Sequence, residues 1–199
     1  MNHQINQRYV YSSLLVTAFL TGCTHMINPP KQAFTGYTAR DKIALKVGLN
    51  ITDELRKAKW EKHSMGDTWV IPIGKAIVQN AGGLARQTFS DVVDLNDGGS
   101  AQTGSVDAIL TPKVAYVNRT QGATSFGKSI VAIKLEWNLT DPGGRSIWLE
   151  TVSGESSGST GWTDPEKILG KALEDVLKKS QEAIASAEAI RQFAATRQR

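Results

Sequence analysis

The single cysteine of this 199-residue chain is the feature that most constrains its fold. One cysteine allows neither an intramolecular disulfide nor a cysteine-rich metal site, so stability has to come from a hydrophobic core. Cys23 also lies at the end of an apolar run that begins at Val10. That run has only about a dozen residues, whereas a membrane-spanning helix needs about 20. It is therefore typical of a leader and not of a transmembrane anchor.

The layout of residues 1–23 indicates how such a leader would be used. Arg8 precedes the apolar run, as in the basic start of a secretory signal peptide. The run ends in the sequence LTGC at residues 20–23, which resembles the lipobox of bacterial outer-membrane lipoproteins. The resemblance implies that the Cys23 thiol receives diacylglycerol, that the signal peptide 1–22 is removed, and that the new amino group is acylated, for example with palmitate. Two or three such chains hold a protein stably on a membrane. An ordinary cysteine in a signal anchor is the alternative.

Residues 23–40 are expected to form a lipidated tether for a single domain over residues 41–199. Pro29-Pro30 favours extended backbone, and the segment has no apolar periodicity. Such a segment would hold the domain off the bilayer. The alternative is that Phe34 and Tyr37 pack on the domain and order part of this segment.

The residue after the cysteine bears on location. In enteric lipoproteins an Asp at this position retains the protein in the inner membrane, so by resemblance Thr24 favours sorting to the outer membrane. We expect the domain to face the periplasm there, and membrane lipid would be its first partner through acylated Cys23.

Composition is that of an ordinary globular domain. Apolar residues make up 40% of the chain and charged residues 21%, with a net charge of +4. These values exclude a fully disordered chain, a collagen-like fibre and a multi-span membrane protein. Four excess positive charges spread along the sequence also argue against a nucleic-acid partner.

Alternating apolar residues predict several β-strands. Apolar side chains occupy every second position over residues 43–51 and again over 131–139, the period of a strand with one buried face. The sequence DPGG at 141–144 supplies turn residues, and residues 145–153 return as a partner strand. We therefore predict an antiparallel hairpin, with Trp137 facing the core.

Four other segments are less regular. Residues 108–117 favour a strand, but Pro112 lacks the ladder N–H, so we expect an edge strand or a bulge there. Residues 52–62 are dense in charge and could form a helical turn or an exposed strand; we favour an irregular hairpin arm anchored by Leu55 and Trp60. Ser- and Gly-rich residues 153–161 are expected to form a flexible loop, as are residues 96–105.

Two helices are predicted on helical apolar spacing. The first begins after Pro72 and extends through Phe89 to Val92. The second begins at Thr163, which would form a capping box with Glu166. Its apolar face thins toward the C-terminus, so its last turns are expected to overhang the sheet or fray.

These elements predict an α+β two-layer sandwich, in which an antiparallel or mixed sheet of at least four strands carries two helices on one face. The order of leader, tether, strand, helix, several strands and C-terminal helix resembles YajG-type and lipopolysaccharide-assembly-type small lipoproteins. That resemblance covers most of residues 23–199 at the level of element order. It implies no binding residues for this chain.

The sequence contains little material for catalysis. Its three histidines, at positions 3, 25 and 63, fall in the leader, the tether and the charged arm, and neither a nucleophile elbow nor a phosphate-binding glycine loop is present. Glu136 and Glu150 lie on the two strands of the predicted hairpin and could form a carboxylate pair, although a salt-bridged sheet face explains them equally well. We expect no cofactor, no metal and no enzymatic activity.

Tryptophans are the remaining candidates for a functional surface. Trp60 and Trp162 lie in polar surroundings, and Trp148 is out of phase with its apolar neighbours, so it would lie on the outer face of the sheet. An exposed Trp is a good interface anchor, but Trp also covers the edge of a small core.

Two functions are compatible with this sequence. We favour a lipid-anchored, non-catalytic envelope lipoprotein, an accessory in outer-membrane assembly, transport or a surface complex, with an envelope protein as partner. The alternative is an envelope enzyme or small-ligand binder whose site lies between sheet and helices.

Overall fold

The computed structural model describes residues 23–30, 42–64, 66–95, 105–121, 127–159 and 163–197. The predicted signal peptide, the predicted tether beyond Pro30, the loop at 96–104 and Trp162 lie outside these residues. The elements in chain order are β1 (Thr24–Met26), β2 (Ile43–Asn50), α2 (Asp53–Lys57), β3 (Trp60–Ser64), β4 (Asp67–Ile71), α3 (Ile73–Thr88), β5 (Phe89–Leu95), β6 (Ala108–Gln121), β7 (Lys128–Thr140), β8 (Ser146–Ser159), α5 (Pro165–Ser186) and α6 (Glu188–Arg197).

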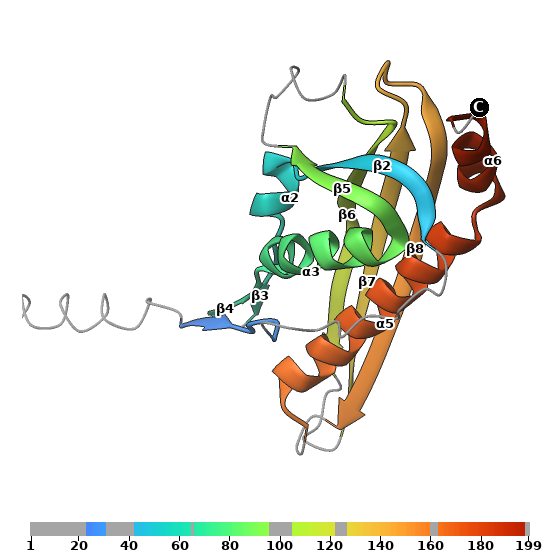
Figure 1. The fold of residues 1–199 in the computed structure, drawn as a ribbon. Coiled ribbons are helices and arrows are strands. Elements are labelled where there is room, and N and C mark those ends of the chain that lie inside the picture. Colours follow the sequence, from blue (N-terminus) through green and yellow to red (C-terminus); the bar gives the residue numbers. More distant parts are fainter. Residues whose placement is uncertain are drawn as a thin grey trace, which may run out of the picture.

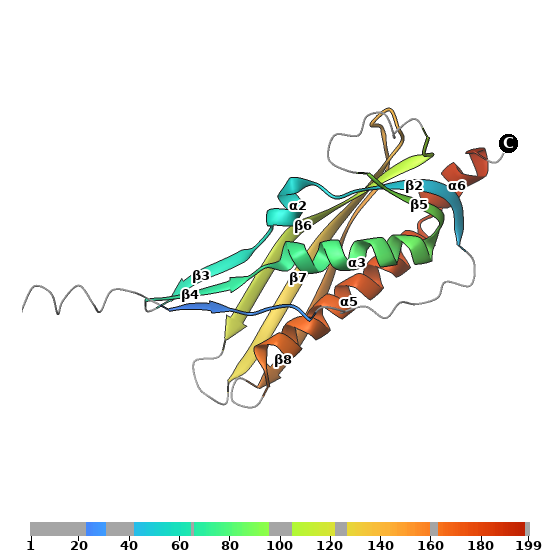
Figure 2. The same cartoon turned by 60° about the vertical axis from the view of Figure 1, so that its left-hand side comes forward.

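A five-stranded mixed sheet with the order β5-β2-β6-β7-β8 forms the larger layer (Figure 1). Strand β2 runs parallel to both of its neighbours, and the remaining pairs are antiparallel. This arrangement confirms the predicted α+β class. The structure adds a second sheet with the order β1-β4-β3, which projects beside the larger sheet (Figure 2). The sequence pattern does not predict this sheet.

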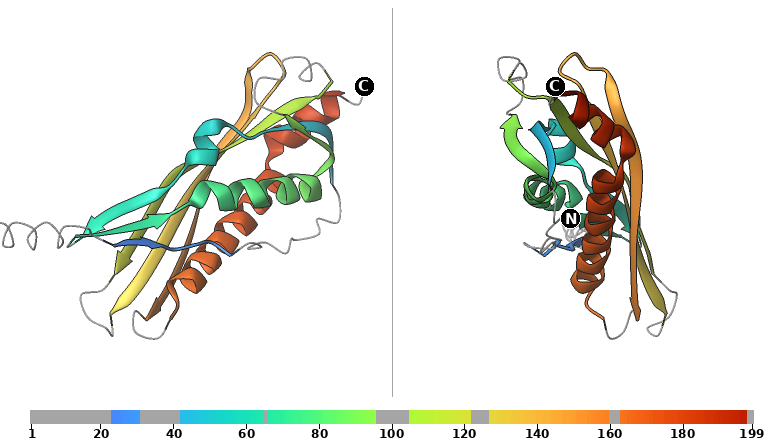
Figure 3. Two further views of the ribbon diagram at one scale, coloured as in Figure 1. Left: turned by 90° about the vertical axis from the view of Figure 1, so that its left-hand side faces the viewer. Right: turned by 45° about the vertical axis from the view of Figure 1, so that its right-hand side comes forward.

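Both long helices cover the same face of the large sheet, with α3 over its parallel half and α5 over β7 and β8 (Figure 3). The alternation predicted for residues 131–139 is confirmed: every second side chain from Val131 to Leu139 is buried beneath these helices. Trp137 is fully buried there, and its indole N–H donates to Ser180 Oγ at 2.8 Å. Apolar side chains therefore fill the interface between α5 and the sheet.

The predicted hairpin is also confirmed, with β7 and β8 paired along their whole length. Gly144 has φ +86°, which suits glycine, and its N–H donates to Asp141 O at 2.9 Å. The hairpin is longer than predicted. Residues 153–159 continue strand β8, where a flexible loop was expected, because α5 lies directly against this stretch.

The first helix ends earlier than predicted. Helix α3 stops at Thr88, and Phe89 and Val92 belong to strand β5, which pairs in parallel with β2. Phe89 is fully buried at the start of that strand. Its apolar spacing continues that of the helix by coincidence, so local periodicity places the boundary too late.

Two smaller predictions are refined at Pro112 and at the start of α5. Strand β6 lies inside the sheet, but β2 pairs only with residues 108–110 of it, so Pro112 faces no ladder partner on that side. A register shift follows between Val114 and Tyr116, which confirms the expected bulge. The N-cap of α5 is Asp164, which accepts from the Glu166 N–H at 2.9 Å, and not Thr163 as predicted.

The ends of the described chain are better ordered than the sequence suggests. Thr24–Met26 form strand β1, where a tether was expected, and Ile27 is buried in the core. At the C-terminus a break at Ala187 starts the separate helix α6, whose Ile190 is fully buried. Among the described residues, no helix is long and apolar enough to cross a bilayer.

Candidate membrane-anchor site

Cys23 is an exposed, free cysteine located immediately before strand β1. Its carbonyl accepts the Thr68 N–H at 2.9 Å, and β1 then pairs in parallel with β4. Ile27, the residue directly after β1, donates its N–H to Val70 O at 2.9 Å. The candidate lipidation site is therefore joined to the folded domain without an intervening linker.

The segment after β1 is held against helix α5. The Asn28 N–H donates to Glu166 Oε1 at 3.2 Å, and a Cβ on Gly170 would lie 2.9 Å from the Pro30 ring. These contacts extend the ordered part of the expected tether to Pro30.

Strand β1 presents different side chains to its two sides. Met26 is 57% exposed, one of three large apolar side chains on the described surface with such exposure. His25 points to the other side and stacks on Trp69 of β4, with ring centroids 4.5 Å apart and planes 20° from parallel. Its Nε2 lies 3.5 Å from an Asp67 carboxylate oxygen.

Trp69 links the small sheet to the large one. The Arg119 guanidinium of β6 lies over the Trp69 ring, 5.1 Å from its centroid. Lys62 of β3 is the cross-strand partner of Trp69, so its side chain leaves the small sheet on the same face. The Trp69 indole of β4 therefore has side chains from β1, β3 and β6 as neighbours. We call His25, Lys62, Trp69 and Arg119 the anchor-proximal cluster.

Arg119 is the most unusual member of this cluster. It pairs with Val131 across β6 and β7, so it occupies the face of the large sheet that is otherwise apolar. Only 8% of the residue is exposed, and its Nε has no hydrogen-bond partner within the described part of the chain. Burial lowers the pKa of Arg119 from its usual value, because desolvation disfavours the charged form.

The predicted tryptophan anchors are placed differently from one another. Trp60 pairs with Ile71 at the base of the small sheet and is half-buried against the core. Trp148 is opposite the buried Leu139, so the prediction that it lies on the outer face is wrong; it packs half-buried on the helix-covered side. The outward side chain is its neighbour Leu149, which is 58% exposed. Trp162 lies outside the described residues.

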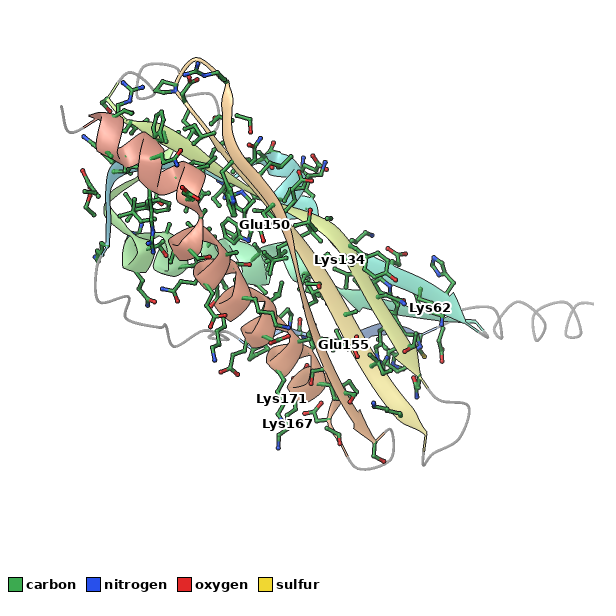
Figure 4. All side chains as sticks on the ribbon, turned by 90° about the vertical axis from the view of Figure 1, so that its right-hand side faces the viewer. Lys62, Lys134, Glu150, Glu155, Lys167 and Lys171 are labelled. Atoms are coloured by element: carbon green, nitrogen blue, oxygen red, sulfur yellow. The ribbon has the colours of Figure 1, made fainter. Side chains whose placement is uncertain are left out.

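Glu136 and Glu150 are not brought together. The register pairs Glu136 with Thr151 and Glu150 with Trp137, which places the two carboxylates on opposite faces of the hairpin. Figure 4 labels Glu150 on β8. Within the described ranges, no group of three or more His, Cys, Asp or Glu side chains is arranged to hold a metal ion.

Two open hollows lie elsewhere on the surface. One, of about 600 Å³, separates α6 from the start of β8 and is flanked by Arg145 and Arg197. The other, of about 280 Å³, lies beside α3 near the salt bridge between Arg86 and Asp94. Both sets of lining residues are remote in sequence from Cys23. Arg145 forms an ion pair with Asp141, and Arg197 lies over the Phe193 ring.

The anchor-proximal cluster does not follow from the sequence pattern, because a bulge in β6 and the short strand β1 determine where its residues lie. The bulge between Val114 and Tyr116 shifts the alternation of β6, so Arg119 cannot be assigned to the inner face from the pattern that begins at Ala108. His25 was assigned to a tether, and strand β1, which fixes its position, is only three residues long.

Comparisons with known proteins establish the fold alone. The sequence matches no protein-family model and none of the curated proteins. A Xanthomonas campestris protein of the DUF330 family shares the fold at 12% identity, over 86% of this chain and 98% of that one, with a TM-score of 0.53.

Two further solved structures overlap less well. A minor lipoprotein from Acinetobacter baumannii is 10% identical over 73% of this chain and 94% of its own, with a TM-score of 0.45. The PelC dodecamer subunit from Paraburkholderia phytofirmans is 15% identical over 71% and 93%, with a TM-score of 0.37. Overlaps of this size do not establish a common fold, and the resemblance to YajG-type lipoproteins stays a prediction.

Proposed function

We propose that this protein is a lipid-anchored, non-catalytic lipoprotein of the bacterial envelope, with the acyl chains on Cys23. The observation that carries the proposal is the sequence LTGC at residues 20–23, whose cysteine is free, exposed and located just before the first strand. A modifying enzyme can reach such a thiol, and the lipid can leave the domain without disturbing its core.

The geometry around Cys23 supports a close attachment to the bilayer. A flexible tether would let the domain diffuse away from the surface, whereas β1 starts at the very next residue. The exposed Met26 side chain lies in the same short strand and can enter the interfacial region beside the acyl chains. We infer that the small sheet faces the membrane.

The anchor is tested by replacing Cys23 with Ala in the full chain. The variant is expected to incorporate no radiolabelled fatty acid and to keep residues 1–22, because the modified thiol is required before the signal is removed. Thr24→Ser is the matched control and should be labelled and processed normally. Normal processing and membrane fractionation of Cys23→Ala would contradict the proposal.

Outer-membrane location belongs to the same proposal and rests on Thr24. Replacing Thr24 with Asp should move the protein to inner-membrane fractions, while Thr24→Ser leaves it with the outer membrane. Thr24 is exposed, and its β1 backbone pairing does not depend on the side chain, so neither change should affect folding. An unchanged distribution of Thr24→Asp would contradict this location.

An accessory role in assembly, transport or a surface complex requires an envelope protein partner. Leu149 is exposed on the outer face of β8, which α3 and α5 leave uncovered, and is the best position for a photo-crosslinking residue. We expect one envelope protein to be captured from Leu149 in living cells and not from Glu174 on the exposed side of α5. Equal capture from the two positions would contradict a specific partner on that face.

A further inference from the structure

A buried arginine without an acidic partner normally requires an anion. Charged side chains are almost never fully buried unless they are paired, because desolvation costs several kcal/mol per ion. Arg119 is more than nine-tenths buried, its Nε has no hydrogen-bond partner, and none of the ion pairs among the described residues includes it. Its contact with the Trp69 ring compensates only part of that cost, since a cation–π contact is weaker than a charge-assisted hydrogen bond to an anion.

The surroundings of Arg119 carry a net positive charge. Lys62 leaves β3 beside Trp69, and Figure 4 shows it at the end of the molecule where the small sheet projects. A carboxylate also contacts the cluster, because an Asp67 oxygen lies 3.5 Å from His25 Nε2. Arg119 and Lys62 therefore bring two positive charges to the cluster against the one negative charge of Asp67.

We propose that the anchor-proximal cluster binds the phosphate of an anionic phospholipid headgroup, with the Arg119 guanidinium as its principal ligand. Arg presents several N–H donors in a planar fork that matches phosphate oxygens, and Lys62 adds a second cation. The Trp69 indole suits the boundary between headgroups and acyl chains, where tryptophan is enriched. The choice of a lipid phosphate rests on the proposed function, because acylated Cys23 would bring this face to the membrane surface.

Position distinguishes this site from a general basic surface. His25 is two residues from Cys23, on a strand that is hydrogen-bonded to β4, and Trp69 is the cross-strand partner of His25. A lipid headgroup next to the anchor would therefore lie close to the His25 and Trp69 side of the cluster. The exposed Met26 on the other side of β1 would contact the acyl region of the same leaflet.

A different explanation of Arg119 has to be separated from this one. Among the described residues, no strand pairs with β6 on the β2 side beyond Leu110, and inward-pointing charges on such edges prevent edge-to-edge association. Under that explanation Arg119 would bind no ligand, and its loss would cause self-association without a change in lipid binding.

The test is a titration of the purified, isotope-labelled full chain in a nonionic detergent, followed by NMR at the Arg119 Nε–H and the Trp69 indole N–H. The probes are dihexanoylphosphatidylglycerol, dihexanoylphosphatidylcholine and inorganic phosphate. We expect the anionic lipid to shift both resonances with saturation, and the zwitterionic lipid and inorganic phosphate to bind at least about tenfold more weakly. Equal affinity for the zwitterionic lipid, or for inorganic phosphate, would overturn the assignment to an anionic headgroup.

Variants identify the residue responsible. Arg119→Gln should weaken binding of the anionic lipid at least about tenfold, as loss of a charge-assisted hydrogen bond does. Arg145→Gln, at an exposed arginine in the β7–β8 turn, is the matched control and should bind like the unmodified chain. Unchanged lipid binding by Arg119→Gln, with or without self-association in sedimentation, would overturn the proposal.

Two further variants keep the test decisive. If Arg119→Gln does not fold, Lys62→Gln at an exposed position is expected to weaken lipid binding severalfold, and unchanged binding by that variant would overturn the proposal. Cys23→Ser should bind the short-chain lipid as well as the acylated chain does. Failure of acylation and failure of headgroup binding are therefore separate results.

Discussion

Trp137 shows how a single polar atom can determine the packing of a whole helix. Its indole lies in the apolar interface between β7 and α5, where an unsatisfied N–H would cost free energy. Ser180 accepts that N–H at 2.8 Å and donates its own hydroxyl to Val176 O at 2.7 Å. This pair fixes the position of α5 along the sheet more precisely than apolar contacts alone would.

Replacing Ser180 with Ala should therefore destabilise the protein. The buried indole N–H loses its acceptor, which is expected to lower the free energy of unfolding by about 1–3 kcal/mol. Ser186→Ala, at an exposed position of the same helix, is the control and should change it by less than about 0.5 kcal/mol. Urea unfolding measures both, and equal effects would show that the Trp137 bond is not important for stability.

Asp141 makes the β7–β8 turn sensitive to pH. The Arg145 backbone N–H donates to one carboxylate oxygen at 2.9 Å and the Arg145 guanidinium contacts the other at 3.1 Å. These interactions hold the pKa of Asp141 below its ordinary value of 3.8, because they favour the charged form. The folded-state pKa is lowered, so this stabilisation is complete above pH 3.8 and is lost as the pH falls through the folded-state pKa.

Replacing Asp141 with Ala should consequently lower stability at neutral pH and have no effect in strong acid. The measurement is the difference in unfolding midpoint between the two proteins as the pH is lowered. A difference that stayed constant below pH 3.8 would contradict the role of the ionised carboxylate.

At the scale of elements, strand β8 and helix α5 approach so closely that glycine is required between them. A Cβ on Gly154 would lie 2.4 Å from Val176 N and 2.7 Å from Ala172 O, both backbone atoms of α5. Such distances are impossible without displacement of the helix, which explains a glycine in the middle of a strand.

Gly154→Ala should lower the melting temperature, because α5 would have to move away from the sheet that it covers. Gly83→Ala is the informative comparison, since nothing lies within 4 Å of a Cβ at that exposed position in α3. It should raise stability by about 0.5–1 kcal/mol through higher helix propensity. Thermal unfolding of both variants tests the prediction, and a neutral Gly154→Ala would show that the contact is looser than described.

Elements that local sequence determines were predictable, and those that distant contacts determine were not. Strand β7, its turn and the bodies of α3 and α5 follow from periodicity and turn residues. Strand β5 depends on parallel pairing with β2, in which Val92 lies opposite Val47, and β1 depends on β4. The last residues of β8 are rich in Ser and Gly, a composition that predicts a loop. One of these residues is Gly154, the glycine that permits the close contact with α5. Arg119 could not be predicted as a site residue for the same reason, because distant contacts determine its position. Cys23 could be predicted because its motif lies within residues 20–23.

At the scale of the whole molecule, the proposed anchor and the β7–β8 turn lie at different ends. Figure 2 shows the small sheet projecting at one side, while β7 runs toward the end of the molecule that carries α6 and β8 returns from it. A lipid attachment at Cys23 would therefore give the domain a defined orientation on the membrane.

Energy transfer to a bilayer-embedded acceptor can measure that orientation. A donor dye attached after Lys62→Cys substitution on β3 should be quenched strongly, and a donor attached after Gly143→Cys substitution in the turn should be quenched much less. Inserting about 20 Gly and Ser residues between Cys23 and Thr24 should reduce the difference between the two positions, because the domain could then tumble. Equal quenching of the two donors in proteins that lack the insertion would contradict the close attachment.

The hydrogen bond from Thr68 to the Cys23 carbonyl has a consequence for biogenesis. A protease that cuts the bond between residues 22 and 23 needs extended chain on both sides of it, and in the finished fold the downstream side already belongs to β1. Maturation and strand docking thus compete for the same stretch of backbone. We expect the leader to be cut first, which would make the addition of β1 to its sheet a late event in the life of the molecule.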